Sequence, residues 1–517
     1  MSVVSCGFVR SRLRAWPPGR AVRDRSFRRP MPQVGPVGDI VEHRRASFCV
    51  ARRAVGSVPV RMSDTEAIMW AVEKDPALRS DFCNLTILEH VPEDDRMTHT
   101  VARAVGAIPR LGQRVVNAPL RIAPPSFADD PTFDLAAHVR RVALPGQGSD
   151  RALLDLCGAL AERPFDRARP LWEFTLIEGL SGGRAALLQK IHHTITDGVG
   201  GLRLSLAFID FEPAGPADVP APVSNLDARR DHSTPLQATR TAVLDAATRN
   251  VVMARRALGD ASRVLTHPAE LPGRAADTAR LLRSLQRQLL NTEPARSDVM
   301  EGRSLARHFE TYSIPLPALQ AAAHRLGGSI NDAYVTGLAG ALGRYHERFE
   351  SGADALRLAM PVSTRDRGDD AANRFVPARV VIPIQPSADS AKLFELVRER
   401  LILAREERAI GAAEGLAVLL TGLPTSVLVA MARAQTRTTD FAATNLRGSP
   451  LPLYIAGAHV LANFPFGPRT ATALNATVLS YCEDLNVGFN IDPAAMTDIG
   501  AFMADVAESF DAILEFA

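Results

Sequence analysis

Lysine is almost absent from this 517-residue chain, and the phosphate-binding signature of P-loop enzymes is missing as well. Only Lys74, Lys190 and Lys392 occur, so Arg supplies nearly all of the positive charge. Aromatic residues make up 6% of the chain, which argues against a surface on which nucleic-acid bases stack. The sequence contains no GxxxxGK[ST] phosphate loop. This absence argues against a P-loop nucleotide site.

The five cysteines show no pairing pattern. Cys6 and Cys49 lie in an Arg-rich N-terminal segment, whereas Cys83, Cys157 and Cys482 are far apart and form no CxxC pair. We therefore expect buried, reduced thiols in a cytosolic protein rather than a disulfide framework.

The net charge of +3 is unevenly distributed along the chain. Residues 1–61 contain 13 Arg and three acidic residues, a net charge of +10, which leaves −7 on the rest. A mildly acidic folded part argues against nucleic acid as a partner.

The first 61 residues are rich in Arg, Pro and Gly and show no sustained apolar period. Met62 begins a run that is typical of a protein start, with Ser63 or Asp64 able to cap a helix. Three explanations stay open: a mis-assigned start codon, a disordered basic arm that contacts anionic lipid, and a transit peptide. A secretory signal is disfavoured because no apolar core follows the early Arg residues.

A chain of 517 residues is too long for one compact core, so two domains are expected. Helical and strand patterns alternate before residue 213, a Pro- and Ala-rich linker follows, and a second mixed region runs to the end. The predicted division is 1–61 (extension), 62–213 (first domain), 214–300 (linker and helical connection) and 301–517 (second domain).

Hydrophobic periodicity predicts the main elements. The predicted helices are Thr65–Glu73, Thr98–Ile108, Asp150–Glu162, Asn331–Phe349 and Asp498–Leu514. The predicted strands are Asn84–His90, Phe133–Val142, Trp172–Glu178, Arg184–His192, Leu356–Val362 and Pro377–Ile384. Leu236–Leu290 has a basic helical pattern, which fits a solvated bridging helix or a helix that lies on a membrane surface.

The uncharged stretch Gly415–Ala432 is long enough to suggest a membrane span. Pro424 interrupts it, so we expect two short helices broken at Leu423-Pro424 instead. A peripheral membrane protein is compatible with this pattern, and an integral one is disfavoured.

The segment with the clearest chemistry is His192-His193-Thr194-Ile195-Thr196-Asp197-Gly198, at the end of an apolar strand. Neighbouring strand residues point to opposite faces, so only one histidine can face a reaction channel. A neutral imidazole can take a proton from an alcohol. Asp197 can fix the turn or orient the ring, and Gly198 lets the backbone make a corner.

A histidine beside apolar residues is more often part of a core, but the pair followed by Asp-Gly favours catalysis. A metal site is not predicted, because adjacent histidines diverge and no Cys or third His lies close in sequence.

The histidine segment resembles the HHxxxDG motif of CoA-dependent acyltransferases and of peptide-synthetase condensation domains. Further segments are similar to those of the bacterial wax ester synthase/diacylglycerol acyltransferase family. They are Pro164–Glu173 with its Pro170-Leu171-Trp172, Gly327–Ala333 with Asn331-Asp332, Met360–Arg365, Asn373–Phe375, Thr444–Gly448 and Pro452–Gly457. The resemblance extends from about Met62 to the C-terminus.

Two segments depart from that family's pattern. Thr444–Ser449 lacks two prolines of the family's Ser-Asn-Val-Pro-Gly-Pro stretch, and Asp81–Leu85 replaces its Pro-Met-His-Val-Gly-like strand. Acyl chain length or acceptor choice can therefore differ from that of better-known members.

The resemblance implies an α/β (α+β) fold with two chloramphenicol-acetyltransferase-like domains facing each other across a central channel. It implies acyl-CoA as co-substrate with no bound cofactor. The implied acceptor is diacylglycerol, giving triacylglycerol, or a fatty alcohol, giving a wax ester. A cytoplasmic location is expected, with peripheral contact at the inner face of the plasma membrane or at a lipid droplet.

The resemblance also implies roles for single residues. His193 would be the general base in a direct transfer, His192 a brace, and Asp197 a support for the loop, with Arg365 as its ion-pair partner. Asn331 and Asp332 would position substrate or stabilise an oxyanion, although a helix N-cap explains them equally well. Two alternative functions stay open: a condensation-type enzyme that takes its acyl group from a carrier protein, and a non-catalytic lipid-binding relative.

Overall fold

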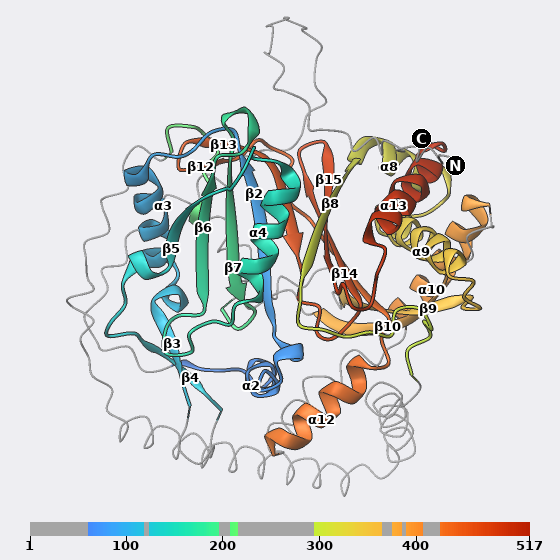
Figure 1. Cartoon of the computed structure of the whole chain (residues 1–517), viewed down its shortest axis with the longest axis horizontal. Coiled ribbons are helices and arrows are strands. Elements are labelled where there is room, and N and C mark those ends of the chain that lie inside the picture. Colours follow the sequence, from blue (N-terminus) through green and yellow to red (C-terminus); the bar gives the residue numbers. More distant parts are fainter. Residues whose placement is uncertain are drawn as a thin grey trace, which may run out of the picture.

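The protein is built around two mixed sheets that stand side by side, each covered by helices (Figure 1). The computed structural model describes residues 60–117, 124–195, 207–215, 294–363, 375–384, 389–406 and 424–517.

The first sheet has the strand order β12-β13-β2-β7-β6-β5. Its strands are β12 (Tyr454–Ile455), β13 (Ala458–Phe466), β2 (Asp81–Leu88), β7 (Ala185–His192), β6 (Trp172–Glu178) and β5 (Val139–Ala143). Only β5 and β6 run parallel; the other neighbours are antiparallel. The central strand β7 is buried at seven of its eight positions. A strand that is covered on both faces has a nearly continuous run of apolar residues. The first four residues of β7, which precede Gln189, form such a run.

Two strands of this sheet, β12 and β13, come from the C-terminal part of the chain. β13 pairs with β2 from Phe466–Cys83 to Val460–Leu88, with a register shift at Leu461. The second predicted segment therefore contributes two strands to the sheet of the first, and residue 301 does not separate the two sheets.

The second sheet has the order β10-β9-β11-β14-β15-β8. Its strands are β10 (Phe375–Pro383), β9 (Ala355–Ser363), β11 (Phe441–Leu446), β14 (Leu474–Tyr481), β15 (Asp484–Ile491) and β8 (His308–Pro315). Its helices are α8 (Leu316–Arg325), α9 (Ile330–Arg348), α10 (Ser390–Glu406) and α13 (Ile499–Leu514). They form one core with the sheet, and α8, α9 and α13 lie on its outer side in Figure 1.

Close packing between α9 and α13 depends on two glycines. A Cβ at Gly337 would lie 2.3 Å from the Phe510 ring, and one at Gly340 would lie 2.2 Å from the Ser509 hydroxyl. The Phe510 ring cannot move away without repacking, so α9 approaches α13 this closely only with glycine at 337, whereas a side chain at 340 would require the Ser509 hydroxyl to rotate.

The first sheet is covered on both faces. α3 (Asp94–Ala107) packs on one face, while α4 (Asp150–Glu162) and β8 pack on the other. The β8 contact joins the two halves, because the rings of Phe309 and Phe466 stack with centroids 4.0 Å apart.

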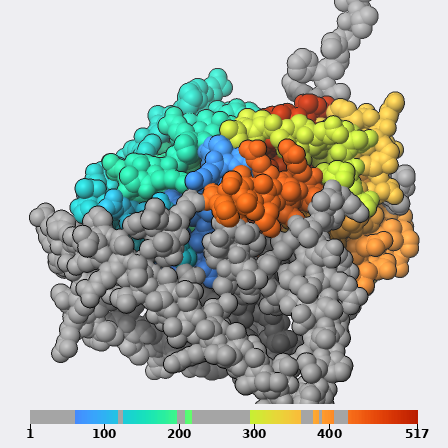
Figure 2. Space-filling view, turned by 90° about the horizontal axis from the view of Figure 1, so that it is seen from below, coloured from blue at the N-terminus to red at the C-terminus, as the bar shows by residue number. Residues whose placement is uncertain are grey.

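Ion pairs also cross the junction between the halves. Asp81 at the start of β2 pairs with Arg307 at 2.8 Å, and both side chains are buried. Asp75, after α2 (Asp64–Val72), pairs with Arg433 of α12 (Thr425–Thr436). Figure 2 shows α12 in orange against the blue N-terminal segment, in agreement with the packing of α12 on α2.

Most of the predicted elements are confirmed, some of them to the residue: α4 and β6 have the predicted bounds, and Asp498 caps α13. The predicted strand Phe133–Val142 is wrong in its first half. Asp134 caps a short 3₁₀ turn, Leu135–Ala137, and the strand begins only at Val139. Of the two helices predicted around Leu423-Pro424, the second begins after Pro424 as predicted, whereas the first and the segment Leu236–Leu290 lie outside the described residues.

The cysteines agree with the expectation of unpaired thiols. Cys83 and Cys157 are buried and free, and Cys482 is half-buried and free. Burial raises the pKa of Cys83 to about 12, so this thiol is unreactive. Ser63 caps α2 in a reciprocal pair with Glu66, as expected for this segment. No helix in the described part of the chain is long and apolar enough to cross a membrane.

Candidate active site

The two adjacent histidines lie where β7 ends. His192 is the last residue of β7 and pairs across the sheet with Asp81 of β2. His193 follows, and its amide donates to the Ser80 carbonyl at 3.2 Å. Their rings lie in different surroundings: His192 contacts Trp70 and Phe165 edge-on, whereas His193 lies 4.9 Å from the Phe82 ring. The predicted divergence of the two side chains is confirmed.

His192 is buried, and both of its ring nitrogens have partners. The Thr194 amide and hydroxyl lie 3.1 and 2.8 Å from Nδ1, while Nε2 lies 2.6 Å from a carboxylate oxygen of Glu73. An amide can only donate, so Nδ1 must accept and the proton must be on Nε2. This pattern fixes the neutral Nε2–H tautomer of His192 and leaves no nitrogen of this ring for a substrate.

Glu73 is a residue of this site that the sequence did not reveal. Oε1 accepts from His192 and, at 2.7 Å, from the Ser80 amide, while Oε2 pairs with Arg167 at 3.1 Å. Because the Ser80 carbonyl in turn accepts from the His193 amide, Glu73 contacts both the residue before His193 and the residue hydrogen-bonded to it across the sheet. The one available signal was its position at the end of the predicted helix Thr65–Glu73.

Arg110 is a second residue that the sequence did not reveal. Its guanidinium donates to the Thr194 carbonyl at 2.6 Å and to Glu66 of α2 at 2.5 Å. The guanidinium also lies over the Phe127 ring, 4.5 Å from its centroid. Arg110 therefore holds the first turn after the histidines against α2.

His193 differs from His192 in its environment. It is half-buried, and its imidazole makes no hydrogen bond within the described residues. Burial is the largest cause that lowers the pKa of His193, to about 4, against the opposing effects of Asp81 and Glu73. The ring is therefore neutral at physiological pH and has a lone pair available for a proton.

Three further residues of the predicted site cannot be placed. Asp197, Gly198 and Arg365 lie outside the described residues. In the part of the chain that the structure does describe, no group of three His, Cys, Asp or Glu side chains could hold a metal ion.

Asn331 and Asp332 lie at the start of α9, in the second half. Ser329 caps this helix, and Asp332 completes the reciprocal pair by accepting from the Ser329 amide at 2.9 Å. Asn331 accepts from Asn445 at 3.5 Å, and its buried Nδ2 has no partner in the described part of the chain. The structure thus places Asp332 in the cap, whereas Asn331 has spare donors.

The Pro170-Leu171-Trp172 segment is in direct contact with the histidine strand. The Leu171 carbonyl accepts from the His192 amide at 3.0 Å. Trp172 is fully buried and donates its indole N–H to the Leu111 carbonyl at 2.8 Å. Trp172 is therefore a core anchor that positions the end of β7, as its sequence context allowed.

Comparisons with known proteins agree with this arrangement. The family model of the wax ester synthase/diacylglycerol acyltransferase catalytic domain matches residues 62–334, and that of the WS/DGAT C-terminal domain matches residues 371–514. A Mycobacterium tuberculosis (strain H37Rv) protein named as a diacylglycerol O-acyltransferase is 33% identical over 469 residues, which cover 88% of this chain and 93% of that protein.

Two solved structures share the fold. The wax ester synthase/diacylglycerol acyltransferase from Marinobacter aquaeolei VT8 aligns with a TM-score of 0.59 at 19% identity, covering 88% of this chain and 98% of that one. A starter condensation domain of rhizomide synthetase, solved with C8-CoA, aligns with a TM-score of 0.53 at 14% identity, covering 89% and 95%.

These matches confirm the predicted fold class, two chloramphenicol-acetyltransferase-like domains, because both neighbours are of that kind. They also confirm that the chain is an acyltransferase. The condensation-domain match shows the fold alone, whereas the family models and the mycobacterial relative distinguish between the two candidate families. The chain belongs to the wax ester synthase/diacylglycerol acyltransferase family.

Proposed function

We propose that this protein transfers a long-chain acyl group from acyl-CoA to the hydroxyl of diacylglycerol or of a fatty alcohol, with His193 as the general base. The observation that carries the proposal is the contrast between the two histidines. His192 has both nitrogens engaged, whereas His193 is neutral and makes no hydrogen bond within the described residues. The family supplies the donor and acceptor classes.

In the proposed reaction, the acceptor hydroxyl attacks the thioester carbonyl while His193 takes its proton. The tetrahedral intermediate then collapses, the C–S bond breaks, and the thiolate of CoA leaves and takes up the proton from His193. A pKa near 4 makes His193 a weak base, so proton transfer must accompany the attack rather than precede it. The transfer needs acyl-CoA as a co-substrate and passes through no acyl-enzyme.

We assign the remaining residues supporting roles. His192 and Glu73 brace the end of β7, and Asp197 holds the loop that follows. Asn331 is the candidate for substrate positioning or oxyanion stabilisation, because its Nδ2 makes no hydrogen bond within the described part of the chain. Asp332 is assigned to the helix cap. Asp197→Ala should therefore lose both activity and thermal stability, and an unchanged melting curve would contradict the structural part of its role.

Product analysis tests the proposed substrates. The protein would receive radiolabelled long-chain acyl-CoA with diacylglycerol, with fatty alcohol, or with neither, and the lipids would be separated by thin-layer chromatography. Labelled triacylglycerol or wax ester would establish the acceptor class. Transfer only from an acyl-carrier-protein thioester would favour the condensation-type alternative, and lipid binding without product would favour a non-catalytic relative.

We also propose that the enzyme meets its lipid acceptors at a membrane or lipid-droplet surface in the cytoplasm. The acceptors are poorly soluble lipids, and Leu446 and Leu451 around the end of β11 are 40% and 56% exposed. Co-flotation of the protein with vesicles that contain diacylglycerol would support this contact. Recovery of the protein only in the vesicle-free fraction would contradict it.

A further inference from the structure

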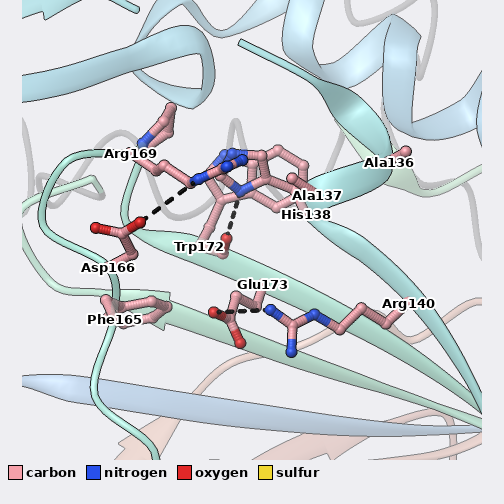
Figure 3. A pocket seen from close by; sticks show the side chains of 10 residues that line it. Ala136, Ala137, His138, Arg140, Phe165, Asp166, Arg169, Trp172 and Glu173 are labelled. Carbon is pink, nitrogen blue, oxygen red and sulfur yellow. Dashed lines mark hydrogen bonds and ion pairs between the residues drawn. The ribbon is translucent and has the colours of Figure 1, made fainter. Parts of the chain in front are cut away.

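A charged pocket of about 300 Å³ opens beside the histidine strand. Its walls come from two segments, the turn and strand around His138–Arg140 and the stretch Phe165–Glu173 that contains Pro170-Leu171-Trp172 (Figure 3). The volume is at the lower end of the range for small-molecule sites. The mechanism proposed above does not use this pocket.

Two guanidinium groups on the walls are available to an anion. Arg140 is 3.6 Å from Glu173 and Arg169 is 3.5 Å from Asp166, and both arginines are exposed. Neither guanidinium donates a hydrogen bond within the described residues, and both ion pairs are longer than a hydrogen bond of this kind, so the described residues leave these N–H donors for a ligand. Paired donors of this geometry match phosphate oxygens.

The other walls offer complementary chemistry. The carboxylates of Asp166 and Glu173 can accept hydrogen bonds from hydroxyl or amino groups. The half-buried Phe165 ring adds an aromatic surface, while the buried rings of His138 and Trp172 close the floor. Phosphate-binding, hydroxyl- or amine-binding and aromatic groups in one pocket suit a nucleotide.

The pocket lies at the same end of the strands as His193, because β6 begins at Trp172 where the antiparallel β7 ends. Trp172, in its floor, pairs with Ile191 on the neighbouring strand, two residues before His193. Strand spacing and rise therefore put the Cα atoms of Trp172 and His193 roughly 8 Å apart. A ligand with a long flexible arm could fill the pocket and still reach His193.

We propose that this pocket holds the 3′-phospho-ADP end of acyl-CoA, an inference that rests on the proposed use of acyl-CoA as donor. Arg140 and Arg169 bind the phosphates, Asp166 and Glu173 accept from the ribose hydroxyl or the adenine amino group, and Phe165 contacts the base. The pantetheine arm then passes along the ends of β6 and β7 and presents the thioester to His193.

Comparison of two donors tests this proposal. Acyl-pantetheine carries the same thioester without the nucleotide, so the Arg140→Ala/Arg169→Ala double variant should use it as well as the unchanged protein does. With acyl-CoA, the KM of the double variant should rise about tenfold with little change in kcat. Arg141→Ala is the matched control, because Arg141 is also on β5 but pairs with Asp94 and Glu178 outside the pocket.

An equal KM for acyl-CoA in the double variant and the unchanged protein would overturn the pocket assignment. If the unchanged protein transfers no acyl group from either donor, the proposed function fails, and calorimetry with adenosine 3′,5′-bisphosphate then tests the pocket alone. Binding that is lost in the double variant but kept in Arg141→Ala would support the pocket. Absence of binding to the unchanged protein, or equal binding of inorganic phosphate, would exclude a nucleotide site.

Discussion

At the scale of single residues, the two histidines of the motif differ in whether their rings have partners. The alternation of side chains along a strand predicted that the two imidazoles point in different directions. This prediction needed only the fact that the two histidines are adjacent in the sequence. Glu73 and Arg110 could not be predicted in the same way. Glu73 is 119 residues away from His192, and Arg110 is 84 residues away from Thr194. Contacts over such separations depend on tertiary packing, of which a single sequence carries no local pattern.

The depressed pKa of His193 predicts how activity depends on pH. A base with a pKa of about 4 stays neutral as the pH falls through 6.5, so kcat/KM should show no loss in the usual histidine range. We expect the acidic limb of the kcat/KM profile to fall near pH 4. A limb centred near 6.5 would contradict a base whose pKa is lowered to about 4.

The contact of Glu73 with this site predicts a shift in the pKa of His193 when Glu73 is replaced. Its carboxylate raises the pKa of His193 against the effect of burial, so Glu73→Gln should lower that pKa further while keeping an acceptor for His192. Titration of the imidazole Cε1–H resonance by NMR would measure this change. A merely structural role for Glu73 would leave the titration midpoint of His193 unchanged. In addition, Glu73→Gln should keep more activity than Glu73→Ala, which loses the acceptor as well.

At the scale of elements, the helices and strands with a regular pattern of apolar residues could be predicted from the sequence. Those without such a pattern were misplaced or missed. α4 has a regular apolar face, and β6 is almost entirely buried, so their bounds could be predicted. The segment Phe133–Val142 has apolar residues at strand-like spacing, but Asp134 accepts from the Ala136 amide and turns the chain before Val139. β8 alternates poorly between buried and exposed positions, because it lies between the two halves, and was not predicted.

Two variants at the start of α9 test whether Asp332 has a structural role. Asp332→Ala removes the partner of the Ser329 amide and should lower the free energy of unfolding by about 1 kcal/mol. Turnover per folded molecule should stay close to that of the unchanged protein. Asn331→Ala is the matched variant: we expect little change in unfolding, measured in urea, and a higher KM. Loss of turnover in Asp332→Ala at unchanged stability would instead indicate a catalytic role.

At the scale of the whole molecule, β13 joins the two halves, because it comes from the C-terminal part of the chain and pairs within the first sheet. β13 was not predicted as a strand, and its burial does not alternate regularly, so length and local pattern suggested two consecutive domains. The family resemblance, carried by motifs in a fixed order, predicted the chloramphenicol-acetyltransferase-like fold, which local patterns could not. The Phe309–Phe466 stack and the buried Asp81–Arg307 pair then fix the second half against the strand that bears the histidines.

The Asp81–Arg307 pair predicts a large effect on stability. Asp81→Ala leaves the buried Arg307 without its counter-charge and should cost roughly 3–5 kcal/mol of unfolding free energy. Urea denaturation would measure the loss, with Lys392→Ala as a control at an exposed ion pair that should show no measurable change. A denaturation curve like that of the unchanged protein would mean that this pair does not hold the halves together.

The most direct test of the proposed mechanism is release of free thiol from long-chain acyl-CoA, with diacylglycerol, with fatty alcohol, or with neither. We predict acceptor-dependent release by the unchanged protein and by His90→Ala, a control at an exposed histidine. His193→Ala should release thiol at least about 100-fold more slowly while melting at a similar temperature. Equal rates in His193→Ala and the unchanged protein would contradict His193 as the base.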